Sequence, residues 1–263
     1  MKRITAVLAF VLILAPVAAT PESQNETRAQ TTSTTETAPA LDQILDKYVQ
    51  ALGGKAAFEK LTSRVTTQSM SRPDGEARVE IFEKAPNKRL VATTLADSSK
   101  LMTGFDGAVG WGRNQNGELQ EIKDLELANL RQNSEFYREI KLKDEFPQMK
   151  LKGKETLEGR VVYLIEAPTA SGRMEKMYFD AQSGLLVRRM QQVVAFIRQS
   201  DDEIPEAKII DVEYDYEDYR AVDGVKLPFL IRRRMPIFVS TIKVKEVKHN
   251  VAIDDAKFKK PAS

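Results

Sequence analysis

One repeated pattern constrains the fold of this chain more than any other: apolar runs are joined by short turns that contain Asp and Gly. The fullest copy spans residues 175–192, where a strand-forming run meets turn residues 180–184 and the strand pattern then resumes. Glycine accepts the positive φ angles that such turns require. Looser copies have their turns at residues 73–75, 105–107 and 222–224. Together the copies predict that most of the chain is a single antiparallel meander.

The clearest alternation of apolar and acidic residues lies at positions 210–217. Apolar residues at the even positions share one face of this strand, and acidic residues at the odd positions share the other. A two-residue turn then folds the next strand back on this one. In that register Asp215 lies opposite Arg232. Glu213 then lies opposite Arg234, so opposite charges face each other across the two strands.

Strand patterns recur at short and even intervals from residue 64 to residue 247. Residues 161–165 are apolar at every position, which predicts a strand that is buried on both faces. The spacing predicts a mainly β fold of the α+β class, with about ten or eleven strands in a strongly curved antiparallel sheet.

Two segments have helical rather than strand periodicity. Residues 41–61 repeat apolar side chains at helical spacing and are interrupted by two glycines, which predicts a helix followed by a shorter one. Residues 124–137 predict an inserted helix with Asp124 as its N-cap. An open curved sheet must cover its apolar concave face, and these helices are the candidates for that cover.

Residues 1–40 are expected to lie outside the folded domain, which spans residues 41–263. Lys2 and Arg3 precede an apolar stretch and then small residues before position 20, so residues 1–19 are predicted to be a cleaved signal peptide. An uncleaved membrane anchor is the alternative, but the apolar stretch is short for a span. Residues 20–40 are polar and Thr-rich, which predicts a disordered linker. Export across the inner membrane follows from the predicted signal peptide.

The composition argues against several classes of function. The chain contains no Cys, so it has no disulfide, no thiolate metal site, no Cys nucleophile and no lipid-modified Cys. Without Lys2 and Arg3, 38 basic residues balance 38 acidic ones. A balanced charge gives no general attraction for nucleic acid, and we expect no such partner.

No group of residues carries a catalytic signature. His249 is the single histidine, and we expect it beyond the last strand and solvated rather than catalytic. Residues 201–203 are acidic but lack the spacing and the glycine of a calcium loop. Arg232 and Arg234 could meet a phosphate, but the acidic strand beside them favours salt bridges. We therefore predict that the protein is not an enzyme and has no catalytic residue, metal site or cofactor.

Trp111 is the single Trp and lies between two glycines. Its ring either fills the core of the sheet or lines a ligand cavity beneath the helices. If there is a cavity, strand alternation suggests which residues line it. The candidate ligand-binding residues are Val79, Ile81, Trp111, Met177, Tyr214, Phe229 and Ile231.

Several of these segments, taken in order, resemble the outer-membrane lipoprotein-sorting superfamily. They are the N-terminal helix that ends in Leu52-Gly53-Gly54, residues 105–107 with Trp111, residues 178–187, and residues 219–229 (YRAVDGVKLPF). The best-known members of the superfamily are a periplasmic lipoprotein carrier and an outer-membrane lipoprotein receptor. The resemblance covers residues 41–261 and implies a half-open β-barrel whose concave face binds acyl chains under a helical lid. No individual binding residue is carried over.

The resemblance leaves two functions open. The first is a periplasmic carrier that transports lipids, or the acyl chains of lipoproteins, in an apolar cleft as a monomer. The lack of Cys departs from the receptor, which is itself a lipoprotein, and favours a soluble carrier or sensor. The second is a non-enzymatic envelope sensor or scaffold with a filled core that binds another envelope protein. A hydrolase ranks third, because the sequence offers no nucleophile with a matching base.

Overall fold

The computed structural model describes residues 39–169, 172–197, 206–236 and 238–262. The expected signal peptide, nearly all of the expected linker and the acidic residues 201–203 lie outside these ranges. Within them, no helix is long and apolar enough to cross a bilayer.

Thirteen strands form one antiparallel sheet in the order β6-β5-β4-β3-β2-β1-β13-β12-β11-β10-β9-β8-β7. Their bounds are β1 Ser63–Arg72, β2 Gly75–Lys84, β3 Lys88–Thr94, β4 Lys100–Phe105, β5 Gly110–Arg113, β6 Leu119–Ile122, β7 Lys150–Leu157, β8 Arg160–Pro168, β9 Met174–Asp180, β10 Leu186–Ile197, β11 Glu206–Val222, β12 Val225–Arg234 and β13 Val239–His249. Apart from β1 and β13, neighbouring strands are consecutive in the chain, as a meander requires.

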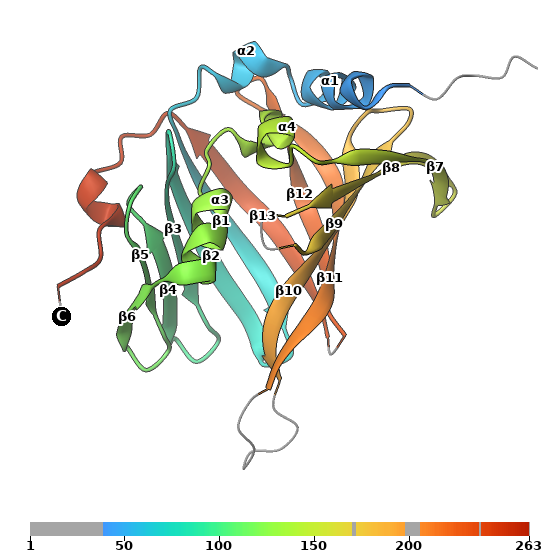
Figure 1. Ribbon diagram of the computed structural model, residues 1–263. Helices are drawn as coiled ribbons and strands as arrows, with labels where there is room; N and C mark the ends of the chain where they lie inside the picture. Colours follow the sequence, from blue (N-terminus) through green and yellow to red (C-terminus); the bar gives the residue numbers. More distant parts are fainter. Residues whose placement is uncertain (1–38, 170–171, 198–205, 237, 263) are drawn as a thin grey trace, which may run out of the picture. The chain divides into compact units, whose positions relative to one another are not determined.

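The sheet is strongly curved and does not close, with β6 and β7 at its edges (Figure 1). The predicted half-open, mainly β architecture with helices is therefore confirmed, although the strands are more numerous than expected. One strand that the sequence did not predict is β6, which has four residues. A run of that length is too short to show a clear alternation.

The predicted pairing of β11 with β12 is confirmed. Asp215 lies opposite Arg232, and Glu213 lies opposite Arg234. Arg234 makes ion pairs with both Glu213 and Asp215, and Arg232 pairs with Glu217 at 2.8 Å. Charge alternation on two neighbouring strands thus fixed a register that the structure reproduces.

The strand at residues 161–165 matches its prediction only in part. Val162 and Ile165 are fully buried, but Val161 is 49% exposed. Val161 is the second residue of β8, directly after the turn at Gly159, where the strand projects beyond the core. A continuous apolar run therefore overestimated burial at the end of the strand.

The N-terminal helices agree with their prediction. α1 spans Leu41–Ala51 and α2 spans Lys55–Phe58. Between them, Gly53 has a φ of +116° and lies against the β11–β12 turn, where an added Cβ would come 2.1 Å from the carbonyl oxygen of Gly224. Only glycine permits this approach, which brings the end of α1 onto the sheet.

The inserted segment differs from the single helix predicted for residues 124–137. It forms α3 (Asp124–Asn133), a 3₁₀ turn η1 (Arg138–Ile140) and α4 (Leu142–Glu145). The N-cap is Lys123, and Asp124 is the first helical residue, with a φ of +51°. At the other end the Ser134 hydroxyl donates to the carbonyl oxygen of Leu130 at 2.7 Å, where the helix stops.

We call the sheet face that carries α1, α3 and α4 the inner face and the opposite one the outer face (Figure 1). Three hydrophobic clusters lie on these two faces, two on the inner face and one on the outer face. The covered core lies between the helices and β8–β12 and includes Tyr48, Phe58, Phe146, Met177, Phe179 and Val225. The strand cluster on the inner face comprises Met70, Ala77, Val79, Leu95 and Ile242 with Ile81, Val91, Leu101 and Ile231. The outer cluster comprises Leu90, Trp111, Ile253 and Phe258 with Val65, Phe82, Met102 and Leu119.

Candidate ligand-binding site

The covered core is a packed interior. The Tyr48 and Phe179 rings meet edge to face at 5.1 Å, and Phe58 and Phe146 are fully buried. The hydroxyl of Tyr219 donates to the carbonyl oxygen of Leu186 at 2.7 Å. A cavity of about 160 Å³ remains between α1, α4 and β10–β12. Ligand pockets commonly have volumes of about 300–1,000 Å³, so the part of this core next to the sheet is largely filled. A second cavity of about 310 Å³ lies among the helices, between α1 and the segment formed by η1 and α4.

The strand cluster is built differently, because each of its members lies on a strand or directly after one. Four side chains lie opposite one another across four neighbouring strands: Ile231, Ile242, Met70 and Ala77. Ile81, Val91, Leu101 and Ile231 are only half-buried. In Figure 1 no helix crosses the lower parts of β1, β2 and β13, where this cluster lies.

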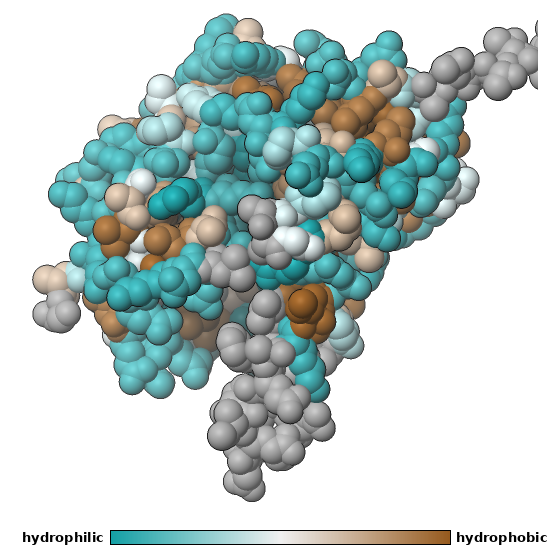
Figure 2. All heavy atoms as spheres, viewed as in Figure 1, coloured by the Kyte–Doolittle hydropathy of each residue, from teal (hydrophilic) through white to brown (hydrophobic). Residues whose placement is uncertain are grey.

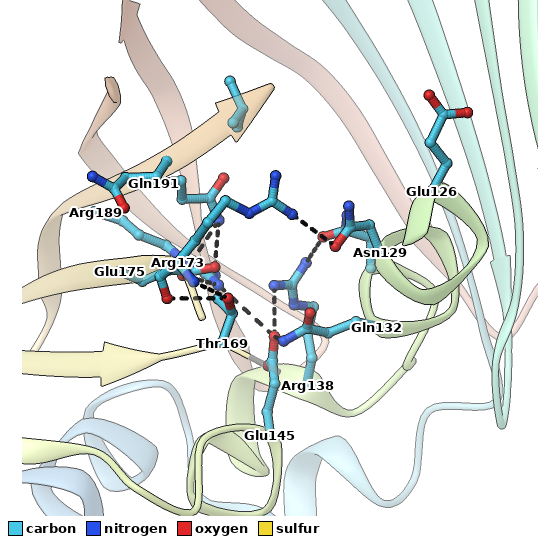
Figure 3. Close-up of a pocket in the computed structure, with 13 residues that line it drawn as sticks. Glu126, Asn129, Gln132, Arg138, Glu145, Thr169, Arg173, Glu175, Arg189 and Gln191 are labelled. Atoms are coloured by element: carbon cyan, nitrogen blue, oxygen red, sulfur yellow. Dashed lines mark hydrogen bonds and ion pairs between the residues drawn. The ribbon is translucent and has the colours of Figure 1, made fainter. Parts of the chain in front are cut away.

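A polar cavity of about 360 Å³ lies between the inserted segment and strands β9 and β10 (Figure 3). Its walls include three arginines and three glutamates: Arg138, Arg173, Arg189, Glu126, Glu145 and Glu175. Amide side chains of α3 and β10 complete the lining. In Figure 2 hydrophilic residues predominate around the hollow at the centre of the view.

Glu145 of α4 is at the centre of the hydrogen bonds in this cavity (Figure 3). Its Oε1 accepts from Gln132 Nε2 at 3.0 Å and from Arg138 at 3.2 Å, and lies 3.8 Å from Arg189. Its Oε2 is buried and has no hydrogen-bond partner among the described residues. Burial raises the pKa of the Glu145 carboxyl above its usual value, although Arg138 and Arg189 oppose the shift.

A second charged group lies next along the inner face. Arg64 Nε donates to Glu83 at 2.7 Å, and the same guanidinium lies 3.5 Å from Glu139. Arg89 lies 3.4 Å from Glu83. Burial alone would raise the pKa of Glu83, but Arg64 and then Arg89 outweigh it and lower this pKa to about 2.

We call these two groups together the charged belt: Arg138, Glu145, Glu175 and Arg189 on one side, and Arg64, Glu83, Arg89 and Glu139 on the other. Arg64, Glu83 and Arg89 lie opposite one another on β1, β2 and β3. Along β1 the strand cluster begins farther on, at Met70, while the covered core lies under the helices. On β1 to β3 the belt therefore separates the two apolar parts of the inner face. On β11 and β12 they meet, because Tyr216 at the edge of the covered core lies opposite Ile231 of the strand cluster.

The structure distributes the predicted lining residues over several environments. Val79, Ile81 and Ile231 meet in the strand cluster. Met177 is fully buried in the covered core. Tyr214 lies opposite Arg189 of the charged belt.

The last two predicted lining residues lie apart from these. The Phe229 ring is buried 4.7 Å beneath the guanidinium of Arg220. Trp111 is 1% exposed and its indole donates to the carbonyl oxygen of Phe258 at 2.8 Å. The neighbouring Gly110 faces Leu127 and Leu130 of α3, so alternation places Trp111 on the outer face. Of the two roles considered for Trp111, the structure supports the core role, under the C-terminal segment.

His249 is not the solvated residue that the sequence suggested. It is the last residue of β13, its side chain is 1% exposed, and its Nδ1 lies 3.0 Å from Asp223. The histidine thus joins the end of β13 to the β11–β12 turn. The sequence could not show this contact, because the two residues meet only when β12 and β13 pair.

The belt residues were not predicted from the sequence, although the sequence contained one signal for them. Glu175 shares a strand face with Met177 and Phe179, both of which are buried. A charged residue on an apolar face requires a partner, and Arg189 provides it at 2.6 Å. Arg138 and Glu145 gave no comparable signal, because they lie in the segment whose helix boundaries were predicted wrongly.

No family model matches this sequence, and no curated protein matches it. Solved structures do match its fold. A DUF1329 family protein from Desulfovibrio piger is 13% identical, with a TM-score of 0.55 over 83% of this chain and 96% of that one. An outer membrane lipoprotein-sorting protein domain from Vibrio parahaemolyticus is 10% identical, with a TM-score of 0.54 over 83% and 97%. A LolA superfamily protein from Nitrosomonas europaea is 12% identical, with a TM-score of 0.54 over 85% and 99%.

These matches cover nearly the whole of each solved chain and most of this one. The chain therefore shares its fold with these lipoprotein-sorting and LolA superfamily structures, in agreement with the resemblance found in the sequence. At this level of identity the agreement concerns the fold, and function must be argued from the residues of the site.

Proposed function

We propose that this protein is a periplasmic carrier that binds lipids, or the acyl chains of lipoproteins, on the inner face of its sheet. The fold that it shares with a lipoprotein-sorting domain supports this proposal. The observation that carries it is the strand cluster, an apolar surface on the inner face whose outermost side chains are only half-buried.

An acyl chain lying on this surface would complete the burial of Ile81, Val91, Leu101 and Ile231. Each methylene group removed from water contributes about 0.8 kcal/mol, so a chain held along most of its length binds strongly without any polar contact. The predicted lining residues Val79, Ile81 and Ile231 form part of this surface. We leave Trp111 and Met177 out of the proposed site, because other parts of the protein already bury them.

The carrier role requires no chemistry on the ligand, and the proposal includes neither a catalytic residue nor a cofactor. It does require export, for which the predicted signal peptide at residues 1–19 would serve. The intact mass of the protein recovered from a periplasmic extract tests this step. Cleavage before Thr20 is the expected result, and an uncleaved chain that stays in the membrane fraction would contradict it.

The carrier proposal is tested by binding of cis-parinaric acid, a fatty acid whose fluorescence rises in an apolar site. The test variant is Ile231→Asp, which puts a charge on the strand cluster. Its matched control is Ile209→Asp, because Ile209 of β11 is 63% exposed. We expect the wild type and the control to bind, and Ile231→Asp to lose at least tenfold in affinity while circular dichroism shows that it remains folded.

Two results would overturn the proposal. One is a wild-type protein that takes up no fatty acid and carries no lipid when its intact mass is measured under native conditions. The other is equal binding by a folded Ile231→Asp protein. The first result would favour the alternative, an envelope sensor or scaffold that binds another protein.

A further inference from the structure

The cavity at Glu145 lies beside the proposed acyl surface. Apart from Val193, every residue that lines it has a polar or charged side chain, so it suits a polar headgroup better than an acyl chain. Arg189 on its wall lies opposite Tyr214 of β11, which in turn lies opposite Arg233 of β12. Two residues farther along each strand, Tyr216 lies opposite Ile231 of the strand cluster. Ile231 therefore lies two strands across from Arg189, at about 5 Å for each strand, and one two-residue repeat of roughly 7 Å along the sheet. The cavity and the apolar surface are thus neighbours on one face.

We propose that this cavity receives the primary-ammonium headgroup of a zwitterionic lipid, of the phosphoethanolamine class, whose acyl chains lie on the strand cluster. The inference rests on the proposed lipid-carrier function and assigns the class of lipid. It starts from Glu145, whose side chain is 8% exposed and whose Oε2 lacks a partner. A buried carboxylate oxygen without a partner favours a ligand that donates hydrogen bonds.

The charges of the cavity favour a ligand of zero net charge. Three arginines face three glutamates across the lining, so the formal charges cancel. The guanidinium of Arg189 already pairs with Glu175 at 2.6 Å, and that of Arg138 pairs with Glu145 at 3.2 Å. A purely anionic headgroup would compete with these carboxylates. A zwitterion can direct its ammonium to the Glu145 oxygen and its phosphate to the guanidinium of Arg138.

The lining also distinguishes a primary ammonium from a quaternary one. A primary ammonium donates three hydrogen bonds, and Glu145 Oε2 is a buried acceptor without a partner among the described residues. The amide oxygens of Asn129, Asn133 and Gln192 also line the cavity. Each already accepts one hydrogen bond, and a carbonyl oxygen can accept a second. A choline group has no N–H to donate and is usually bound by aromatic rings. The described residues of the lining include no aromatic side chain. An ethanolamine head therefore matches this cavity better than a choline head.

The experiment uses vesicles that contain equal amounts of phosphatidylethanolamine, phosphatidylcholine and phosphatidylglycerol, all with the same acyl chains. Purified protein is incubated with them and separated by flotation, and its bound lipids are extracted and quantified by mass spectrometry. We expect the ethanolamine lipid to be enriched at least fivefold over the choline lipid. Glu145→Gln should lose this enrichment, because its side chain no longer carries the negative charge that pairs with the ammonium. The matched control, Glu59→Gln at an exposed position directly after α2, should keep the enrichment.

A second measurement tests the cavity without the acyl chains. Glycerophosphoethanolamine and glycerophosphocholine are titrated into the wild-type protein, and amide chemical shifts are followed by NMR. We expect glycerophosphoethanolamine, but not glycerophosphocholine, to change the amide chemical shifts of residues around Glu145 and Gln132. Because these compounds have no acyl chains, this result does not depend on the strand cluster.

The outcomes separate the inference from the function on which it rests. The headgroup inference is overturned if the protein binds the three lipids in equal amounts and glycerophosphoethanolamine changes no amide chemical shift. This result leaves the carrier function standing. Binding of glycerophosphoethanolamine without lipid uptake supports the cavity and overturns the carrier function. Enrichment that persists in a folded Glu145→Gln protein also contradicts the role assigned to Glu145.

Discussion

The covered core and the strand cluster are the two apolar parts of the inner face. They are made from similar residues but differ in what covers them. In the covered core, helices α1, α2 and α4 supply the second layer, and Phe146, Met177 and Phe179 are fully buried. In the strand cluster the members come from strands and their ends, and Ile81 and Ile231 keep part of their surface exposed. A sheet needs a second layer on an apolar face. The difference suggests that the helices complete one part and a ligand completes the other.

The largest expected effect tests whether the two parts differ in packing. Phe179→Ala removes a fully buried ring that contacts Tyr48, and should lower the free energy of unfolding by about 3–5 kcal/mol. Ile231→Ala removes a half-buried side chain and should cost less than about 2 kcal/mol. Urea unfolding followed by circular dichroism measures both. Equal costs would mean that the strand cluster is packed like a core, and the comparison would fail.

The charged belt between the two parts predicts a loss of stability in acid. The folded-state pKa of Glu83 is about 2, below its ordinary value, so its stabilising effect is present above the ordinary pKa. That effect is lost as the pH falls towards 2, and is on the order of 3 kcal/mol. Urea unfolding at about pH 6 and about pH 3 should show about 2 kcal/mol of this loss in the wild type, and a smaller loss in Glu83→Gln.

Glu80 provides the control for this measurement. It lies on the same strand with the opposite orientation and pairs with Arg78 at the surface, where ion pairs contribute little. Glu80→Gln should therefore show the same acid dependence as the wild type. If Glu83→Gln and Glu80→Gln behave alike, the buried pair with Arg64 is not the source of the acid sensitivity.

A bound fatty acid should increase the difference between the strand cluster and the covered core, because it contacts the strand cluster alone. Fatty acid at about one hundred times its Kd should stabilise the wild type by about 2.7 kcal/mol. Hydrogen exchange should slow in β2 and β12, around Ile81 and Ile231, and remain unchanged in α1. Protection of α1 instead would place the ligand under the helices and contradict the assignment of the binding surface.

The sheet could be predicted from the sequence because its signals are local. Each hairpin joins consecutive strands, so a turn and its flanking alternation are enough to give the pairing, as the match of Asp215 with Arg232 shows. The pair β1 and β13, in the middle of the strand order, lacks such a turn. Arg64 lies opposite His249 although most of the domain separates them in the chain. Sequence periodicity carries no information on that contact.

The candidate site was less predictable for the same reason. Val79, Ile81 and Ile231 were found because alternation assigns a face to each strand residue. Glu145 was not, because its position depends on how α3 ends at Ser134 and how the following chain folds back on β10. Alternation also cannot say which face of a curved sheet is the inner one, so Trp111 was grouped with residues that face the other way.

The smallest expected effect concerns His249, which holds the β11–β12 turn beside the covered core. Burial lowers the pKa of His249 below its ordinary value; Asp223 opposes this shift, and Arg64 adds to it. The unfolded chain therefore takes up a proton more readily than the folded one, and stability falls as the pH drops below about 6.5. Urea unfolding at about pH 7.5 and about pH 5.5 measures this loss of stability in both proteins. Between these two pH values, His249→Gln should lose less free energy of unfolding than the wild type. Glu145 has a raised pKa and changes stability in the opposite direction, but it is present in both proteins, so their difference isolates the histidine. An equal loss in the two proteins would show that protonation of His249 does not loosen this turn, and that the acid response of the helix-covered part comes from the belt alone.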